Sequence, residues 1–477
     1  MKLKEQEIDA WLQENEDPYI QDVLEAVKIP SVSEESKSVY PFGKNCADML
    51  DHMEQKLKQY GFSYQNHEYY CASSLILGKE GKKEIGLFSH VDVVPAGEGW
   101  EKDPFYGYVK EGYLVGRGCS DNKGAAFAVI YAMRFLKEHG IQLKNNVRLM
   151  FGCNEENGMA DARYYLKHYS APNLTIVPDS WWPVSCSEKG VFIFEVEMAV
   201  KNGNLRKFET IGADNTVPNR CTCVLERQSN RDTENKLPDV EGICWKQDAD
   251  GSIRLDAYGI GAHASFPDGS KSAVKMLADY LLDQGLAEGD SKSALEFIRT
   301  SISDHDGKAL GIDFRDSFSG NTTHVLTKAR LENGKLRFSY KICYPASEKV
   351  QKGEVYSRLK QYFTREGVTI VNEIASGPHL VDRNHPVVNI LCRNSSKVLG
   401  KTQEPFSQAG GTYAWWMPNS FAAGLGIQDR PQKLFVKEGH GGAHQPDECM
   451  EIDTLLKGIK IYILSLLEID DWLSQEQ

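Results

Sequence analysis

Residues 84–95 read EIGLFSHVDVVP, and this stretch gives the strongest indication of the fold. Its first part is apolar and rich in strand-forming residues, which is typical of a strand buried on both faces. Polar residues and Pro95 then end the run. In open sheets of parallel strands, functional groups gather beyond the carboxyl ends of the strands. We therefore predict a buried strand whose last residues carry chemistry.

The segments around this stretch alternate between helix and strand patterns. An amphipathic helix is predicted up to about Val27, and a second helix over 121–138, closed by Gly140. Buried strands are predicted over 146–153 (NVRLMFGC) and 174–177. This alternation indicates the α/β class, with a mostly parallel central sheet flanked by helices.

The hydrophobic pattern of the sequence changes after Glu188. Alternating apolar and polar residues over 191–200, 253–259 and 336–344 predict half-exposed antiparallel strands, with a helix over 271–284 between them. The apolar, glycine-rich pattern of the first region resumes near Pro378. We therefore predict a catalytic domain formed by 1–186 and 378–477, with an inserted α+β lid domain over 187–377.

Bulk composition limits the class of protein. The chain has 477 residues, too many for one ordinary core, so two or more domains are expected. Hydrophobic residues make up 41% and charged residues 26%, which is typical of a folded globular protein. A net charge of -12 argues against nucleic acid or an anionic membrane as the main partner.

Targeting signals and cysteine usage predict a cytoplasmic protein. The segment 1–16 is charged and lacks the apolar core of a signal peptide. The uncharged run 405–428 contains prolines and several glycines, so we do not interpret it as a membrane span. The 11 cysteines are scattered and form no CxxC pair, which favours reduced thiols over disulfides or a cysteine zinc site.

Several polar residues at predicted strand ends are candidate metal ligands. His90 and Asp92 are two residues apart on a strand, so their side chains share a face. Asp121 stands at a helix start, where a capping role is the more common explanation. The pair Glu155-Glu156 alone would be a solvated acidic loop, and Asp179 alone would not attract notice.

Taken together, these residues predict a dinuclear metal site. Two ions need one bridging carboxylate and, for each ion, a histidine and a terminal carboxylate. Five residues supply that set in chain order without a surplus ligand: His90, Asp121, Glu156, Asp179 and His444. The sequence therefore predicts a hydrolase that activates water and polarises a carbonyl.

At this point the motifs resemble a known family, the dizinc aminoacylase and carboxypeptidase-type metallopeptidases. The resemblance extends from about His90 to Glu448, and the overall length is most similar to the long, PepV-type dipeptidase branch. It implies a dizinc exopeptidase-like fold and a small peptide as substrate. The segments that carry it are SHVDVVP (89–95), GRGCSDNKG (116–124), NEENG (154–158), VPDS (177–180), GAHASFPDG (261–269) and GGAHQPDE (441–448).

The resemblance implies a ligand arrangement. Asp121 would bridge two zinc ions, with His90 and Asp179 completing one ion and Glu156 and His444 the other. Such ligands also accept manganese or cobalt. In this family the peptide bond after the bridging aspartate is cis.

The resemblance also implies catalytic roles. Glu155 would be the general base, passing a proton from water to the leaving amine, and Asp92 would orient His90. His263 in the lid, with Asn215, would stabilise the oxyanion.

The chain departs from the family pattern where the substrate's C-terminal carboxylate is bound. Cys343 and Trp415 stand where this branch has arginines, and neither side chain can pair with a carboxylate in a bidentate way. Lys341 and Arg337 share the strand face of Cys343 and are partial substitutes.

Three functions therefore stay open. The first is a dipeptidase; the second is an N-acyl-amino-acid deacylase or desuccinylase with the same metal site; the third is a metal-binding protein with weak catalysis. We expect a monomer, with a homodimer as the alternative.

Overall fold

The computed structural model describes residues 5–211, 215–226, 237–262, 264–347, 349–427, 435–437 and 439–476. The chain forms two compact units. Unit 1 consists of Met1–Cys186, Val381–Phe406 and Thr412–Gln477, and unit 2 of Ser187–Leu380 and Ser407–Gly411. The chain therefore leaves unit 1 and returns to it twice.

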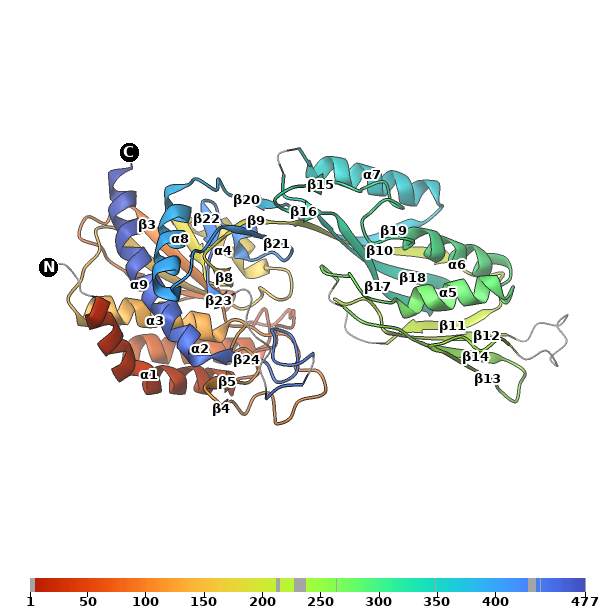
Figure 1. Cartoon of the computed structure of the whole chain (residues 1–477), viewed down its shortest axis with the longest axis horizontal. Helices are drawn as coiled ribbons and strands as arrows, with labels where there is room; N and C mark the ends of the chain where they lie inside the picture. Colours follow the sequence, from red (N-terminus) through yellow and green to blue (C-terminus); the bar gives the residue numbers. More distant parts are fainter. Residues whose placement is uncertain are drawn as a thin grey trace. The chain divides into compact units, whose positions relative to one another are not determined.

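Unit 1 contains most of a large sheet in the order β1-β2-β6-β3-β7-β22-β9-β20, with β21 paired to β9 (Figure 1). Its central run β6-β3-β7-β22 is parallel, whereas β1, β2, β9 and β20 pair antiparallel at the edges. The strands are β1 (Gln65–His67), β2 (Cys71–Ile76), β3 (Glu84–His90), β6 (Asn146–Gly152), β7 (Leu174–Val177), β9 (Ser185–Glu188), β20 (His379–Leu380), β21 (Phe406–Gln408) and β22 (Ser420–Ala422).

Helices pack against this sheet on both faces. On one face α3 contacts β3 and β6, and α1 and α9 pack against α3. On the other face, α4 and the short helix η1 enclose an apolar cluster with β3, β6 and β7. The helices of unit 1 are α1 (Glu5–Val27), α2 (Lys44–Gln59), α3 (Lys123–Glu138), α4 (Ala160–His168), α8 (Pro386–Leu399), η1 (Tyr413–Trp415) and α9 (Ile452–Gln475).

Two small sheets complete unit 1. The first has the order β24-β5-β4, and the second pairs β23 with β8 in parallel. The first connects the segment before α3 with the segment before α9, and the second connects the segment after β7 with the segment after β22. Their strands are β4 (Tyr108–Lys110), β5 (Tyr113–Val115), β8 (Ser180–Trp182), β23 (Leu425–Ile427) and β24 (Cys449–Glu451).

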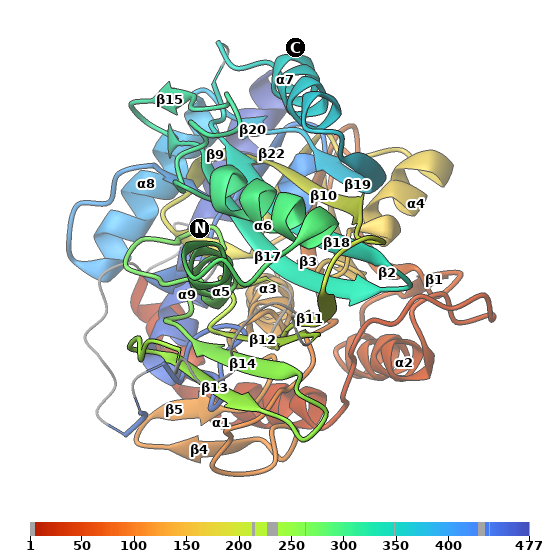
Figure 2. The ribbon, with the colours of Figure 1, turned by 90° about the vertical axis from the view of Figure 1, so that its right-hand side faces the viewer.

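Unit 2 is built on an antiparallel sheet in the order β13-β14-β12-β11-β17-β18-β10-β19. Alternate residues of its long strands, such as Phe338, Tyr340 and Ile342, are buried in one apolar core with α5, α6 and α7. These helices cover one face of the sheet (Figures 1 and 2). The period of two seen in the sequence thus separates a core face from a second face.

The elements of unit 2 have the following bounds. The strands are β10 (Gly190–Ala199), β11 (Leu205–Thr210), β12 (Arg220–Leu225), β13 (Ile243–Gln247), β14 (Ile253–Tyr258), β15 (Arg315–Asp316), β16 (Gly320–Asn321), β17 (Thr323–Glu332), β18 (Lys335–Tyr344) and β19 (Thr369–Ser376); the helices are α5 (Ala273–Asp283), α6 (Gly289–Ser301) and α7 (Lys352–Arg365).

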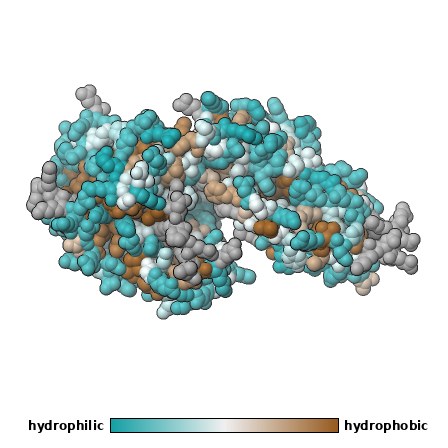
Figure 3. All heavy atoms as spheres, in the orientation of Figure 1, coloured by the Kyte–Doolittle hydropathy of each residue, from teal (hydrophilic) through white to brown (hydrophobic). Residues whose placement is uncertain are grey.

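The fold class predicted from the sequence is confirmed: a mostly parallel sheet flanked by helices, with an inserted antiparallel α+β region. The visible surface of each unit is mostly hydrophilic, with separate hydrophobic areas (Figure 3). Among the helices of the described residues, none combines the length and the apolar character needed to cross a membrane.

Candidate active site

Three neighbouring parallel strands of unit 1 end in the predicted site residues. His90 is the last residue of β3, Glu155 and Glu156 follow β6, and Asp179 follows β7. Because β3 pairs in parallel with both β6 and β7, these ends lie at the same edge of the sheet. Within the stretch 84–95, for which a strand was predicted, β3 ends at His90, so His90 stands at the point where the chain leaves the sheet.

Asp121 presents its two carboxylate oxygens to two different histidines. Its Oδ1 lies 3.0 Å from Nε2 of His90, and its Oδ2 lies 3.2 Å from Nε2 of His444. The peptide bond between Asp121 and Asn122 is cis, as the sequence predicted. A carboxylate with one oxygen toward each imidazole has the arrangement of a bridging ligand.

The remaining candidate ligands complete a compact group. Nε2 of His444 lies 2.9 Å from Oε1 of Glu156, and Nε2 of His90 lies 3.7 Å from Oδ1 of Asp179. In each of two groups, the possible ligand atoms all lie within 4.8 Å of one another. The first group is His90, Asp121 and Glu156, and the second is His90, Glu155 and Asp179. Residues that are distant in sequence therefore converge on one small volume.

Asp92 supports both the imidazole and the acidic loop. Nδ1 of His90 lies 3.0 Å from the backbone carbonyl oxygen of Asp92 and 3.4 Å from its Oδ1. The two carboxylate oxygens of Asp92 accept hydrogen bonds from the backbone N–H groups of Glu155, at 3.2 Å, and Glu156, at 3.1 Å. Fixing Nδ1 in this way directs Nε2 into the site, as metal-ligating histidines require.

Charge in the site is unbalanced toward the negative. Burial, and then the nearby Asp179, raise the pKa of Glu155 well above its usual value. Burial and the charge of Asp121 raise the pKa of Glu156 to about 7, although His444 opposes this shift. Burial alone would lower the pKa of His444, but hydrogen bonds to Asp121 and Glu156 raise it to about 11. The buried carboxylates thus attract cations.

This donor set fits divalent metal ions. Imidazole nitrogen and carboxylate oxygen are the ligands that zinc, manganese and cobalt accept. The carboxylates outnumber the imidazoles, so positive charge supplied from outside would relieve their repulsion. The residues that would hold the ions are His90, Asp121, Glu156, Asp179 and His444.

Glu448 fixes the loop that carries Asp121, a role that was not predicted from the sequence. Its Oε1 accepts hydrogen bonds from the backbone N–H groups of Gly118, Ser120 and Asp121, at 2.9–3.1 Å. Its Oε2 lies 2.6 Å from Nη1 of Arg117, and both side chains are almost completely buried. The arginine of the GRG motif was the available signal, since a buried arginine needs an acidic partner.

A second positioning contact was also missed. Nδ2 of Asn122 donates to Oδ1 of Asp179 at 2.7 Å and to the carbonyl oxygen of Pro178 at 2.9 Å. Asn122 therefore connects the loop before α3 to the end of β7. Asp121 thus lies next to His90 and His444, while the adjacent Asn122 holds Asp179.

The two predicted oxyanion groups belong to unit 2. Oδ1 of Asn215 accepts a hydrogen bond from Nζ of Lys341 at 2.7 Å. The other predicted oxyanion group, His263, lies outside the described residues. Cys343 is buried in β18, with its Sγ 3.5 Å from Oγ of Ser265, and Trp415 lies in η1 of unit 1. Lys341, considered above as a substitute for the missing arginine, is thus already engaged with Asn215.

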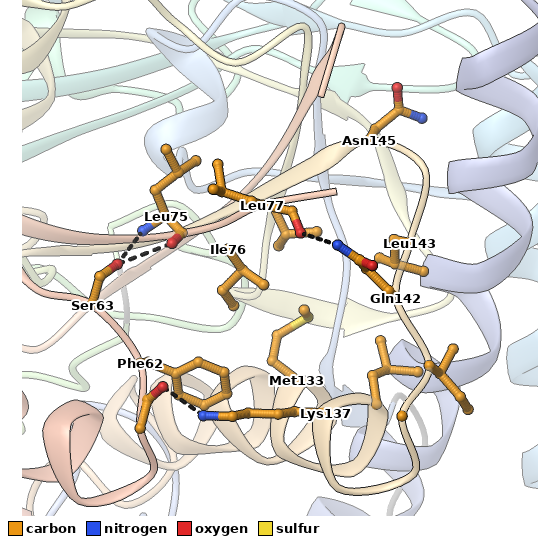
Figure 4. Close-up of a pocket in the computed structure, with 15 residues that line it drawn as sticks. Phe62, Ser63, Leu75, Ile76, Leu77, Met133, Lys137, Gln142, Leu143 and Asn145 are labelled. Atoms are coloured by element: carbon orange, nitrogen blue, oxygen red, sulfur yellow. Dashed lines mark hydrogen bonds between the residues drawn. The ribbon is translucent and has the colours of Figure 1, made fainter. Parts of the chain in front are cut away.

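The clearest apolar pocket of unit 1 lies elsewhere. It has a volume of about 430 Å³ and is lined by residues such as Phe62, Leu75 and Met133 (Figure 4). Asn145 and Val147, at the start of β6, also line it. Glu155 and Glu156 follow the opposite end of β6, and none of the candidate ligands lines this pocket. We assign the chemistry to the acidic centre because its donor atoms, unlike the apolar walls, can activate water.

Comparisons with known proteins agree with this geometry. Residues 86–468 match the profile of peptidase family M20/M25/M40. The chain is 30% identical to a β-Ala-Xaa dipeptidase of Lactobacillus delbrueckii subsp. lactis, over 95% of this chain and 96% of that protein.

Solved structures share the fold. The crystal structure of human carnosine dipeptidase 1 has a TM-score of 0.61 at 16% identity, covering 98% of this chain and 99% of that one. A metallo-carboxypeptidase of family M20 from Sulfolobus solfataricus has a TM-score of 0.58, also at 16% identity, over 94% and 99% of the two chains. The match over 86–468 and the 30% identical relative decide the assignment: this chain belongs to peptidase family M20/M25/M40.

Proposed function

We propose that this protein is a metal-dependent dipeptidase that hydrolyses the amide bond of dipeptides and similar small peptides. One observation carries the proposal. One histidine and the carboxylates from the ends of three parallel strands converge with Asp121 and His444, with neighbouring nitrogen and oxygen atoms 2.9–3.7 Å apart, and Glu155 stands beside them.

The proposed cofactor is a pair of Zn²⁺ ions, with Mn²⁺ or Co²⁺ as alternatives. Asp121 would be shared between the ions; His90 and Asp179 would serve one, and Glu156 and His444 the other. When bound, such a pair polarises the scissile carbonyl and lowers the pKa of water.

Glu155 is the proposed general base. Its pKa is raised by burial and by the neighbouring carboxylates, so it accepts a proton more readily than an exposed glutamate does. It would take the proton of the attacking water and deliver it to the leaving amine. Asp92 keeps Glu155 in place by accepting a hydrogen bond from the backbone N–H group of Glu155 at 3.2 Å, and its carboxylate also orients His90.

Unit 2 supplies the proposed oxyanion donors. The amide of Asn215 and the imidazole of His263 would stabilise negative charge on the carbonyl oxygen. Lys341 holds Oδ1 of Asn215, which directs the donor side of the amide away from β18. We further propose that 1–186 and 378–477 act as the catalytic domain and 187–377 as the lid.

The substrate class rests on the relatives. The bacterial relative is named for β-Ala-Xaa dipeptides and the human structure for carnosine, so small peptides are the proposed substrates. One alternative stays open, an N-acyl-amino-acid deacylase or desuccinylase with the same metal site; its substrates carry the same C-terminal carboxylate, so Cys343 in β18 does not distinguish the two. All eleven cysteines are free, which supports a cytoplasmic location, and we expect a monomer.

The test is a substrate comparison. The protein is stripped of metal, reloaded with Zn²⁺ and incubated with a dipeptide panel and an N-acyl-amino-acid panel. We expect metal-dependent release of amino acids from dipeptides, and none from the stripped protein or from Asp121→Ala. Faster turnover of the acyl panel would identify the deacylase, and turnover of neither would contradict an enzymatic role.

A further inference from the structure

A polar cavity of about 660 Å³ lies within unit 2. Its walls include Lys189, which joins β9 to β10, and residues of the segments that flank β16 and precede β17. Its lining contrasts with the apolar pocket of unit 1, since most of it is charged or hydroxylated. The cavity therefore suits a small polar ligand.

Lys189 is the unusual group in this cavity. Only 8% of this residue is exposed, and its Nζ donates a hydrogen bond to the carbonyl oxygen of Asn321. Within the described part of the chain no carboxylate lies within 4.0 Å of this ammonium group. A buried charge without a counterion is destabilising, so its retention points to a ligand that supplies negative charge.

Among the other charged groups of the cavity wall, Asp268 is exposed, whereas Asp304, Asp306 and Lys308 have close partners. Asp304 accepts hydrogen bonds from the backbone N–H groups of Asp306, Lys308 and Ala309, at 2.8–3.1 Å. Asp306 forms an ion pair with Lys308 at 2.7 Å. The positive charge of Lys189 is thus the one that stays available.

Two threonines, Thr322 and Thr323, line the same cavity as Lys189. Thr322 is 1% exposed, and neither its Oγ1 nor that of Thr323 has a hydrogen-bond partner within the described residues. Thr323 is the register neighbour of Cys343 in β18, which in turn pairs with Val191, two residues from Lys189. An ammonium with unpaired hydroxyls is the donor set that a carboxylate group accepts.

Two other cations, Lys341 and Arg337, were considered in the sequence analysis. Lys341 donates to Asn215, and Arg337 is exposed and lies 3.5 Å from Oε2 of Glu197. Lys341, like Lys189, donates to a neutral oxygen, but neither Lys341 nor Arg337 lines this cavity, so Lys189 is its charged anchor.

We infer that the cavity of unit 2 binds a small carboxylate, with Lys189 as its charged anchor and the threonine hydroxyls as further donors. The carboxylate has two sources: the C-terminus of the peptide substrate or a free carboxylic acid. The first source rests on the proposed function, and the second does not.

The test uses the full, metal-loaded protein with three variants. Lys189→Met removes the charge while keeping the length of the side chain, and Lys189→Arg restores the charge. Lys308→Met is the matched control, because Lys308 lines the same cavity but is paired with Asp306. The first readout is kcat/KM for one dipeptide and for its C-terminal amide; the second is equilibrium dialysis against labelled acetate.

The two sources give different results. If the substrate terminus binds here, Lys189→Met lowers kcat/KM for the free acid by at least about 30-fold, the range for truncating one partner of a buried charge pair, and Lys189→Arg recovers most of it. The amide then changes by less than about 3-fold, since it carries no charge to pair. If a free acid binds instead, Lys189→Met loses one saturable acetate site, and both peptides respond equally.

An unchanged acid-to-amide ratio together with an unchanged acetate isotherm in Lys189→Met would overturn the inference, as would an equal effect of Lys308→Met. If the parent protein hydrolyses no dipeptide at all, the proposed function fails. The acetate isotherms of the parent and Lys189→Met still decide the carboxylate site, because any acetate bound at the metal centre is common to both proteins.

Discussion

Four of the five candidate ligands were accessible from sequence because each stands at the end of a predicted element; His444 was not tied to such an end. His90, Glu156 and Asp179 follow strands, and parallel pairing brings those ends together. Glu448 was not accessible, because its role depends on backbone N–H groups 327–330 residues away. Arg117 signalled that an acidic partner was needed, but only the tertiary structure shows that this partner is Glu448.

At the residue scale, we predict that Glu448→Gln destabilises unit 1. The amide would leave Arg117 without a counterion in a site where both side chains are at most 1% exposed. Breaking a buried ion pair on one side costs about 3–5 kcal/mol. Urea unfolding of the parent and the variant measures the difference directly.

An exposed ion pair provides the control for this experiment. Lys44 and Asp48 form an i,i+4 pair on α2 whose side chains are 63% and 42% exposed. Asp48→Asn should change the free energy of unfolding by less than about 1 kcal/mol. Equal effects of the two variants would show that Glu448 has no special structural role.

At the element scale, several strands were predicted to within a few residues, whereas the ten-residue β17 and the short edge strand β1 were not predicted. The strands predicted over 146–153, 191–200 and 336–344 correspond to β6, β10 and β18. Their length and clear apolar pattern make them recognisable. The hairpin β1–β2 was missed, because β1 has three residues and its pairing with Cys71–Ser73 depends on the rest of the sheet.

This hairpin carries a pH-sensitive contribution to stability. His67 is 1% exposed, and its Nε2 lies 2.9 Å from Oγ of Ser73. Burial, and then the charge of Arg148, lower the pKa of His67 to about 4. Above the unfolded pKa of about 6.5 the ring is neutral in both states; as the pH falls toward 4, only the unfolded chain takes up the proton, so stability is lost.

We therefore predict that, between pH 7 and pH 4.5, the parent loses about 2–3 kcal/mol more of its free energy of unfolding than His67→Gln does. Urea titrations at the two pH values give the comparison. His168→Gln, at an exposed position on α4, should behave as the parent does. Parallel losses in the parent and in His67→Gln would refute this assignment.

At the scale of the whole molecule, the sequence indicated an inserted region by its change in texture, and the fold class is confirmed. The roles that depend on unit 2 stay predictions. His263 lies outside the described residues, and the place of Lys189 in a cavity could not be read from a sequence in which buried and exposed lysines look alike. The division into 1–186, 187–377 and 378–477 also stays a prediction.

The cysteines give a prediction for the intact chain. All eleven are free; Cys244 is exposed, Cys392 is partly buried, and the others are buried. Burial, and then Glu404, raise the pKa of Cys392 to about 11, so its thiolate is scarce near neutral pH. We expect one rapidly reacting thiol in the native protein with a disulfide reagent, absent in Cys244→Ser.

Unfolding without a reductant should then release the full set of eleven thiols. A smaller number would reveal a disulfide and would contradict the cytoplasmic assignment.

The central claim is that the acidic centre of unit 1 hydrolyses peptides with Glu155 as the base. The most direct test measures bound metal and dipeptide turnover together in Glu155→Gln. The account predicts the metal content of the parent protein and a fall in kcat of at least about 10²-fold, because the amide keeps the shape but cannot accept the proton of water. Turnover close to that of the parent at full metal occupancy would contradict it.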